Sequence, residues 1–223
     1  MRDSATEPPR HGDRRRTRIG LLGGSFNPAH AGHLHVAETA LRRLRLDQVW
    51  LLVSPGNPLK ARDGMAPFAE RLASARAIAD GRRIVATSIE ARLGKRYTRD
   101  TLRLLRQRFP RAEFVWIMGA DNLAQFPRWQ RWTGIARAMP LLVLPRPGWK
   151  ARALQGQAAS RLRKARQPRR AAPALAGART PAWLYLPARE NTLSATLLRQ
   201  ARERLHKADA NAASQAASGG ARP

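Results

Sequence analysis

Short apolar runs alternate with amphipathic stretches along most of this chain. The apolar runs are continuous, and they cover residues 18–22, 49–53, 84–86, 113–118, 140–144 and 183–186. Apolar residues recur at helical spacing over about residues 31–46, 67–79, 99–108, 121–126, 128–138 and 194–205. Continuous apolar strands are typical of a parallel sheet covered on both faces. The pattern therefore predicts an α/β fold with a doubly wound, Rossmann-like, mostly parallel sheet and helices on both faces.

The two ends of the chain lack this pattern. Residues 1–17 are rich in Pro, Arg and Asp and predict a disordered leader, and residues 207–223 predict a disordered tail. Residues 18–206 are then expected to form a single domain. Within it, residues 149–180 form a basic excursion with helical potential and expected mobility. Nine Lys or Arg and no acidic residue lie within residues 146–170.

Composition narrows the class of protein. The chain has 223 residues and no cysteine, which excludes disulfides and thiol chemistry and fits a reducing compartment. No secretory signal and no apolar run of about 18–20 residues is visible, so we expect a cytoplasmic protein without a membrane span. The net charge of +27 has two explanations. It indicates a polyanionic partner such as nucleic acid, or it reflects a compositional bias, since the basic residues are widely spread.

Three histidines fall within six residues where the first apolar run turns into the first helix, in the stretch GGSFNPAHAGHLHVAE. Ligands of open α/β sheets bind at this end of the strands, and the N-terminus of a helix attracts anions. His30 and His33 share one face of the first helical turn, whereas His35 points elsewhere. A metal site would need further ligands, which the spacing does not supply nearby. Helix capping with surface histidines is the second alternative, and a phosphate site is the third.

Four segments of the chain resemble a known family. Gly23 to His33 resembles the His-x-Gly-His signature of the nucleotidyltransferase superfamily. The later segments resemble those of bacterial nicotinate-nucleotide adenylyltransferases, in the family's order: Tyr97-Thr98 with Thr101-Leu102, Gly119 to Leu123 with Phe126 and Trp129, and Leu193 to Arg199. The resemblance covers about residues 18–205. It departs at Arg96, where the family has Ser, and residues 1–17 and 149–172 match no motif.

The resemblance implies transfer of the adenylyl group of ATP to nicotinate mononucleotide, which gives deamido-NAD and pyrophosphate in NAD biosynthesis. The ionised phosphate of the mononucleotide attacks the α-phosphorus in line, so no protein nucleophile is required. Catalysis then depends on positioning and charge stabilisation. Magnesium is the implied cofactor, bound through the substrate phosphates and not by a protein ligand. The sequence leaves the oligomeric state open.

The resemblance also implies the residues of the site. The ATP-binding residues would be Gly23, Gly24, Ser25, Phe26, His30, His33, Asp121, Ser194, Thr196 and Arg199. The residues that bind nicotinate mononucleotide would be Lys60, Tyr97, Thr98, Trp129 and Arg146. His30, His33 and Arg199 would be catalytic, Trp129 would stack on the nicotinate ring, and the N–H groups of Tyr97 and Thr98 would bind its carboxylate. From the residues alone, Asp121 also fits a helix N-cap and Trp129 a core side chain.

Other functions remain as alternatives. Within the superfamily, a phosphopantetheine adenylyltransferase typically carries Thr where His30 stands, and a cytidylyltransferase has a different C-terminal signature. A nicotinamide-mononucleotide adenylyltransferase is closer, because the choice between acid and amide depends on backbone geometry. A basic nucleic-acid-binding protein is the alternative of another class, and its binding would fall steeply with salt. The four motifs favour small-molecule nucleotide substrates over nucleic acid.

Overall fold

The computed structural model describes residues 7–56, 64–94 and 97–188. Its strands are β1 (Arg18–Gly24), β2 (Gln48–Val53), β3 (Ile84–Thr87), β4 (Glu113–Gly119), β5 (Leu141–Leu144) and β6 (Trp183–Tyr185). Its α-helices are α1 (Ala31–Leu44), α2 (Phe68–Ile78), α3 (Ile89–Arg92), α4 (Thr98–Arg108), α5 (Ala120–Gln125), α6 (Trp132–Ala138), α7 (Lys150–Leu154) and α8 (Gln157–Arg161). Its 3₁₀ helices are η2 (Phe126–Arg128), η3 (Arg163–Ala165) and η4 (Arg169–Gly177). In these ranges no helix has the length and apolar character needed to cross a membrane. The predicted helix 194–205 and the tail 207–223 lie outside the described residues.

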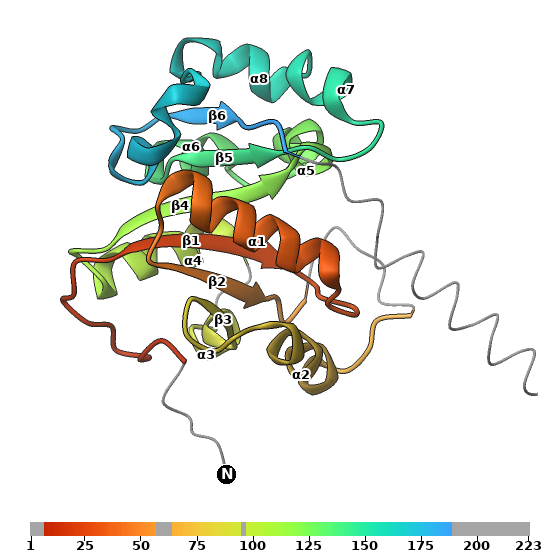
Figure 1. The fold of residues 1–223 in the computed structure, drawn as a ribbon, viewed down its shortest axis with the longest axis vertical. Helices are drawn as coiled ribbons and strands as arrows, with labels where there is room; N and C mark the ends of the chain where they lie inside the picture. The colour runs from red at the N-terminus through yellow and green to blue at the C-terminus, as the bar shows by residue number, and fades with distance from the viewer. Residues whose placement is uncertain (1–6, 57–63, 95–96, 189–223) are drawn as a thin grey trace, which may run out of the picture.

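The strands of the described residues form one parallel sheet in the order β3-β2-β1-β4-β5-β6 (Figure 1). The chain runs from β1 outward to β3 and then returns to place β4 on the other side of β1. In the register of the central strands, Leu21 lies opposite Trp50 on one side and Trp116 on the other. This reversal of strand order is the topological switch point, where open α/β sheets leave a crevice for ligands.

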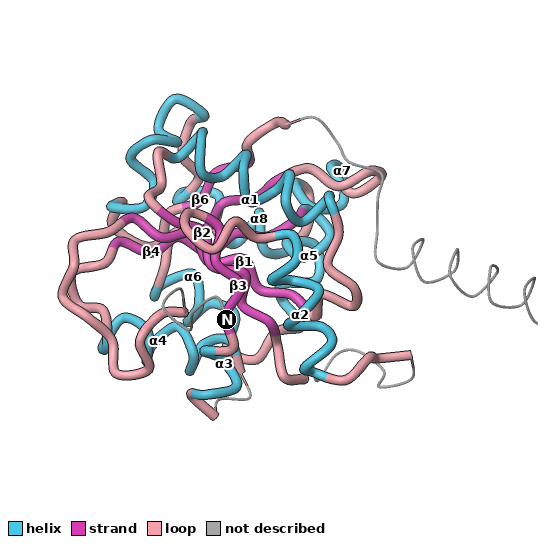
Figure 2. The backbone as a smooth tube through the Cα atoms, turned by 60° about the horizontal axis from the view of Figure 1, so that its bottom comes forward, coloured by secondary structure: helices cyan, strands magenta, loops and turns pink. Residues whose placement is uncertain are grey.

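Helices cover both faces of the sheet, as Figure 2 shows. One face is packed by α3, α4 and α6, through side chains such as Ile89, Leu102 and Ile135. The other face is packed by α1 and η4, through side chains such as Leu41 and Leu175. Successive side chains of a strand point to opposite faces of the sheet, and here both faces are covered. Neighbouring residues along each strand are therefore buried alike, which is why the strands are continuously apolar. The predicted doubly wound parallel sheet is confirmed.

Two residues of types that suit a helix N-cap do not occupy that position. Thr98 is already helical, and Tyr97 is the N-cap residue of α4. Gly119, not Asp121, is the N-cap residue of α5. The sequence also misses α3, because a helix of four residues is too short to show a helical period.

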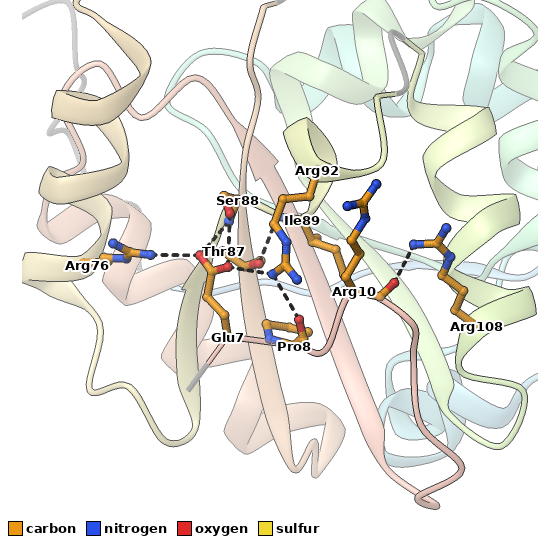
Figure 3. A network of polar contacts seen from close by, with 9 residues as sticks. All are labelled: Glu7, Pro8, Arg10, Arg76, Thr87, Ser88, Ile89, Arg92 and Arg108. Atoms are coloured by element: carbon orange, nitrogen blue, oxygen red, sulfur yellow. Dashed lines mark hydrogen bonds and ion pairs between the residues drawn. The ribbon is translucent and has the colours of Figure 1, made fainter. Parts of the chain in front are cut away.

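The N-terminal segment differs from the predicted disordered leader, because its described part lies against the domain (Figure 3). Glu7 accepts hydrogen bonds from the backbone N–H and the hydroxyl of Ser88, both at 3.0 Å. It also forms ion pairs with Arg76 of α2 and Arg92 of α3, both at 2.9 Å. One carboxylate thus joins the segment to two helices and to the end of β3. The partners are about 70 to 85 residues away in sequence, so local composition does not reveal them.

The basic excursion at residues 149–180 is packed onto the domain. It forms α7, α8, η3 and η4, and it buries apolar residues such as Ala153 and Leu175 against the two faces of the sheet. Trp183 of β6 donates its indole N–H to the carbonyl of Leu162 at 2.9 Å. The helical potential predicted for this segment is confirmed, and its buried side chains belong to the core.

Candidate active site

The turn between β1 and α1 lies at the carboxyl end of a central strand. A Cβ added at Gly23 would stand 2.5 Å from Cη2 of Trp116, and one at Gly24 would stand 3.1 Å from the ring of Phe26. The two glycines therefore make room for aromatic rings, besides any access they give a ligand to the backbone. Phe26 has a φ of +48°, in the left-handed region, and its ring is buried. Only its backbone is available to a ligand.

This turn is held by a residue that sequence reasoning missed. The guanidinium of Arg71 is buried and donates to the carbonyl oxygens of Ser25 at 2.7 Å, Ser54 at 2.8 Å and Ala66 at 3.0 Å. It therefore joins the loops that follow β1 and β2. Burial lowers the pKa of Arg71, although three carbonyl acceptors compensate for part of the lost hydration. A single arginine on a helix of an arginine-rich chain carries no signal that would have revealed this role.

His30 and His33 cap the start of α1 reciprocally. His30 is the N-cap residue, and its Nδ1 accepts the N–H of Gly32 at 3.1 Å. Nδ1 of His33 accepts the N–H of His30 at 3.2 Å, and the two ring centroids are 3.9 Å apart. The structure thus brings the two imidazoles together at the helix N-terminus. It also confirms that they cap, which was the alternative to a phosphate site, and the two roles are compatible.

The capping bond determines which nitrogen of His30 carries a proton. Burial, and then the positive charge of Arg146, lower the pKa of His30 to about 4. The imidazole is therefore neutral at pH 7. Because Nδ1 accepts a hydrogen bond, the single proton lies on Nε2. That Nε2–H is buried and has no partner in the described part of the chain. His30 is therefore a neutral donor held in a fixed orientation.

Asp121 and Arg146 meet at the carboxyl ends of β4 and β5. Nε of Arg146 lies 3.9 Å from Oδ1 of Asp121. Both side chains lie over Gly119, and any side chain at that position would collide with the carboxylate of Asp121. Arg146 is also close enough to His30 for its charge to lower the pKa of the imidazole. The structure thus places Arg146 beside two residues predicted to bind ATP.

Trp129 follows η2 and is half-buried. Its ring is nearly perpendicular to those of Trp116 and Phe126, with centroids 6.3 Å and 5.4 Å away. Part of the ring is thus anchored in the core and part is exposed. Tyr97 and Thr98 begin α4, which packs against α6, and the N–H groups of a first helical turn have no partner within the helix. Both positions are compatible with the predicted mononucleotide site.

Three buried side-chain atoms of the described residues have no hydrogen-bond partner: His30 Nε2, Trp116 Nε1 and Asp121 Oδ1. Buried polar atoms are almost always paired in folded proteins. His30 follows β1, Trp116 lies on β4 with its ring against Gly23, and Asp121 follows β4. All three therefore lie at the β1–β4 switch point. Two donors and one acceptor at this edge indicate a site formed for a polar ligand.

Four predicted site residues lie outside the described part of the chain: Lys60, Ser194, Thr196 and Arg199. In the described part, no three His, Asp or Glu side chains gather closely enough to hold a metal ion.

The fold and the site define a nucleotidyltransferase of the cytidylyltransferase-like family, whose model matches residues 21–201. Curated relatives narrow the class. The chain is 63% identical over 183 residues to a probable nicotinate-nucleotide adenylyltransferase of Gluconobacter oxydans, covering 82% of this chain and 94% of the relative. It is 56% identical over 182 residues to a protein of the same name from Methylorubrum extorquens, covering 82% and 98%. The chain belongs to the nicotinate-nucleotide adenylyltransferase family.

A solved structure supports the same fold. The nicotinic acid mononucleotide adenylyltransferase of Plasmodium falciparum, complexed with NaAD, matches with a TM-score of 0.63. The two chains are 16% identical, and the match covers 82% of this chain and 83% of the other. At this identity the similarity concerns the fold alone.

Proposed function

We propose that this protein transfers the adenylyl group of ATP to nicotinate mononucleotide, giving deamido-NAD and pyrophosphate. A phosphate oxygen of the mononucleotide forms a bond to the α-phosphorus of ATP, and the bond from that phosphorus to the bridging oxygen of pyrophosphate breaks. The cluster of three buried atoms without a hydrogen-bond partner at the switch point carries the proposal, because it provides polar groups for a ligand where this family fold binds one. The family membership identifies the chemistry.

On the ATP side, we assign the polyphosphate to the turn after β1. The neutral Nε2–H of His30 donates to a phosphate oxygen, and the N-terminus of α1 adds its positive dipole end. The ring centroids of His30 and His33 are 3.9 Å apart. His33 therefore contacts the same phosphates, in the transition state. The backbone of Gly23 to Phe26 faces the nucleotide, and Asp121 accepts from the adenosine. Ser194, Thr196 and Arg199 are assigned here from the family motif alone.

On the mononucleotide side, the exposed part of Trp129 stacks on the pyridine ring. The N–H groups of Tyr97 and Thr98 bind the carboxylate at the start of α4, where the helix N-terminus attracts anions. Arg146 and Lys60 face the mononucleotide phosphate. Because Arg146 lies beside Asp121 and His30, its cation stands between the two substrates and reduces the repulsion between their phosphates.

Magnesium is the expected cofactor, bound through substrate phosphates, whose hard oxygens it prefers. When bound, it neutralises charge on the transferred and leaving phosphates. The protein's own contribution is to orient the two polyanions and to place donors around them.

A direct assay tests this function. The protein is incubated with ATP, magnesium and one of three acceptors: nicotinate mononucleotide, nicotinamide mononucleotide or phosphopantetheine. We expect pyrophosphate release to be fastest with nicotinate mononucleotide. Faster release with nicotinamide mononucleotide would make the amide the preferred acceptor instead of the acid. Release with phosphopantetheine alone would refute the proposed function.

A further inference from the structure

Three buried atoms at the switch point, on His30, Trp116 and Asp121, have no hydrogen-bond partner in the described part of the chain. Of these residues, Trp116 is the one to which neither the family motif nor the proposed mechanism gives a role. Of the three buried tryptophans in the described residues, Trp50 donates its N–H to Oε1 of Gln48 and Trp183 donates to the carbonyl of Leu162. The indole N–H of Trp116, which is 4% exposed, has no acceptor among these described residues. A buried donor without a partner is costly, so the arrangement favours an acceptor that the described residues do not supply, such as a bound ligand.

The position of the indole shows where that acceptor would lie. Cζ2 and Cη2 of Trp116 stand 2.9 Å and 2.5 Å from where a Cβ of Gly23 would be. The nitrogen lies on the same edge of the indole as Cζ2. The N–H is therefore close to the last residues of β1, beneath the crevice at the switch point. Gly23 leaves this edge free of any side chain from its own strand.

The same ring contacts the predicted stacking platform. The rings of Trp116 and Trp129 meet edge to face, 6.3 Å apart at an interplanar angle of 82°. Both belong to the core on the face covered by α4 and α6, whereas Phe26 and α1 belong to the opposite face. The donor is thus on the mononucleotide side of the site, and the histidines that bind ATP phosphates begin the helix on the other side.

We propose that the indole N–H of Trp116 donates a hydrogen bond to an oxygen of the mononucleotide that stacks on Trp129. The acceptor is an oxygen of the pyridine carboxylate or of the ribose. A carboxylate bound by two backbone N–H groups still has lone pairs for a third donor. Trp116 is then a binding residue for the acceptor substrate. This inference rests on the proposed function, because it needs nicotinate mononucleotide to be a substrate.

Indole ¹⁵N–¹H spectra of the full chain test the proposal. The Trp116 resonance is assigned from its loss in Trp116→Phe. Saturating nicotinate mononucleotide should move this resonance and slow its exchange with solvent, while those of Trp50 and Trp183 stay in place. Titration with nicotinate and with ribose 5-phosphate separately identifies the oxygen that accepts. If the resonance keeps its position and exchange rate with mononucleotide, or responds to an ATP analogue alone, the proposal is wrong.

Kinetics provide a second readout. Trp116→Phe should raise KM for the mononucleotide about tenfold, as expected for one lost hydrogen bond, and leave KM for ATP within about twofold. Trp50→Phe, which removes a paired N–H from the same core, is the matched control and should change neither constant by more than about twofold. An unchanged mononucleotide KM in Trp116→Phe would overturn the inference while the proposed function stands. Failure of the wild-type chain to release pyrophosphate would instead refute the proposed function.

Discussion

Replacing Glu90 with glutamine should alter how the stability of the protein depends on pH. Glu90 lies on α3, is 8% exposed, and its Oε1 is 3.4 Å from the hydroxyl of Thr101 in the first turn of α4. It has no ion pair with any described residue. Burial raises the pKa of its carboxyl to about 7, and the hydrogen bond with Thr101 opposes this rise only in part. The folded protein therefore keeps a proton that the unfolded chain releases.

The size and sign of the effect follow from these values. A rise from 4.5 to about 7 is worth about 3 kcal/mol, at about 1.36 kcal/mol per pKa unit. Because the folded pKa lies above the unfolded one, this contribution is fully present below pH 4.5. It is lost as the pH rises through 7, since the unfolded chain then binds fewer protons than the folded one. Between pH 5 and pH 8, Glu90 should reduce the free energy of unfolding by about 2–3 kcal/mol.

Urea unfolding of wild type and Glu90→Gln at pH 5 and pH 8 measures this difference. Glutamine is neutral at both values and keeps a hydrogen-bonding group beside Thr101, so the variant should gain about 2–3 kcal/mol relative to wild type between pH 5 and pH 8. Glu70→Gln, at an exposed position, controls for the loss of one negative charge and should show no such gain. A Glu90→Gln effect that is equal at both pH values within about 0.5 kcal/mol would refute the reasoning.

Three further predictions concern the site and the N-terminal segment. His33→Ala should lower kcat by about two orders of magnitude or more, through loss of about 3 kcal/mol of transition-state stabilisation; a steady-state decrease under threefold would remove His33 from the mechanism. Trp129→Ala should weaken mononucleotide binding in calorimetry and leave ATP binding nearly unchanged, and equal losses for both would contradict the stacking role. Glu7→Gln should lower the free energy of unfolding by about 2 kcal/mol at pH 7. Burial raises the pKa of Glu7, but hydrogen bonds from Ser88 and the arginines outweigh it and lower the pKa overall. The difference should therefore shrink as the pH falls below 4.5, and a difference that stays constant through acid unfolding would contradict it.

Much of the fold could be predicted from local patterns. Continuous apolar runs indicated a parallel sheet because, in a sheet covered on both faces, alternate side chains are both buried. The position of His30 and His33 at a strand-to-helix junction likewise followed from chain order. The sequence could not predict the contacts of Glu7, nor those of Arg71. Most of their partners are far away along the chain, and hydropathy patterns report only neighbours within a few residues.

The sequence by itself determined the class of fold, the order of the motifs and the residue types available for binding two polyanions. Only the tertiary structure decided what those residues do. The neutral state of His30 arises from burial and from Arg146, which is 116 positions away. The Trp116 indole can lie against β1 only because Gly23, on the neighbouring strand, has no side chain to collide with it. Burial, charge proximity and the absence of a partner depend on packing through space, so chain order does not encode them locally.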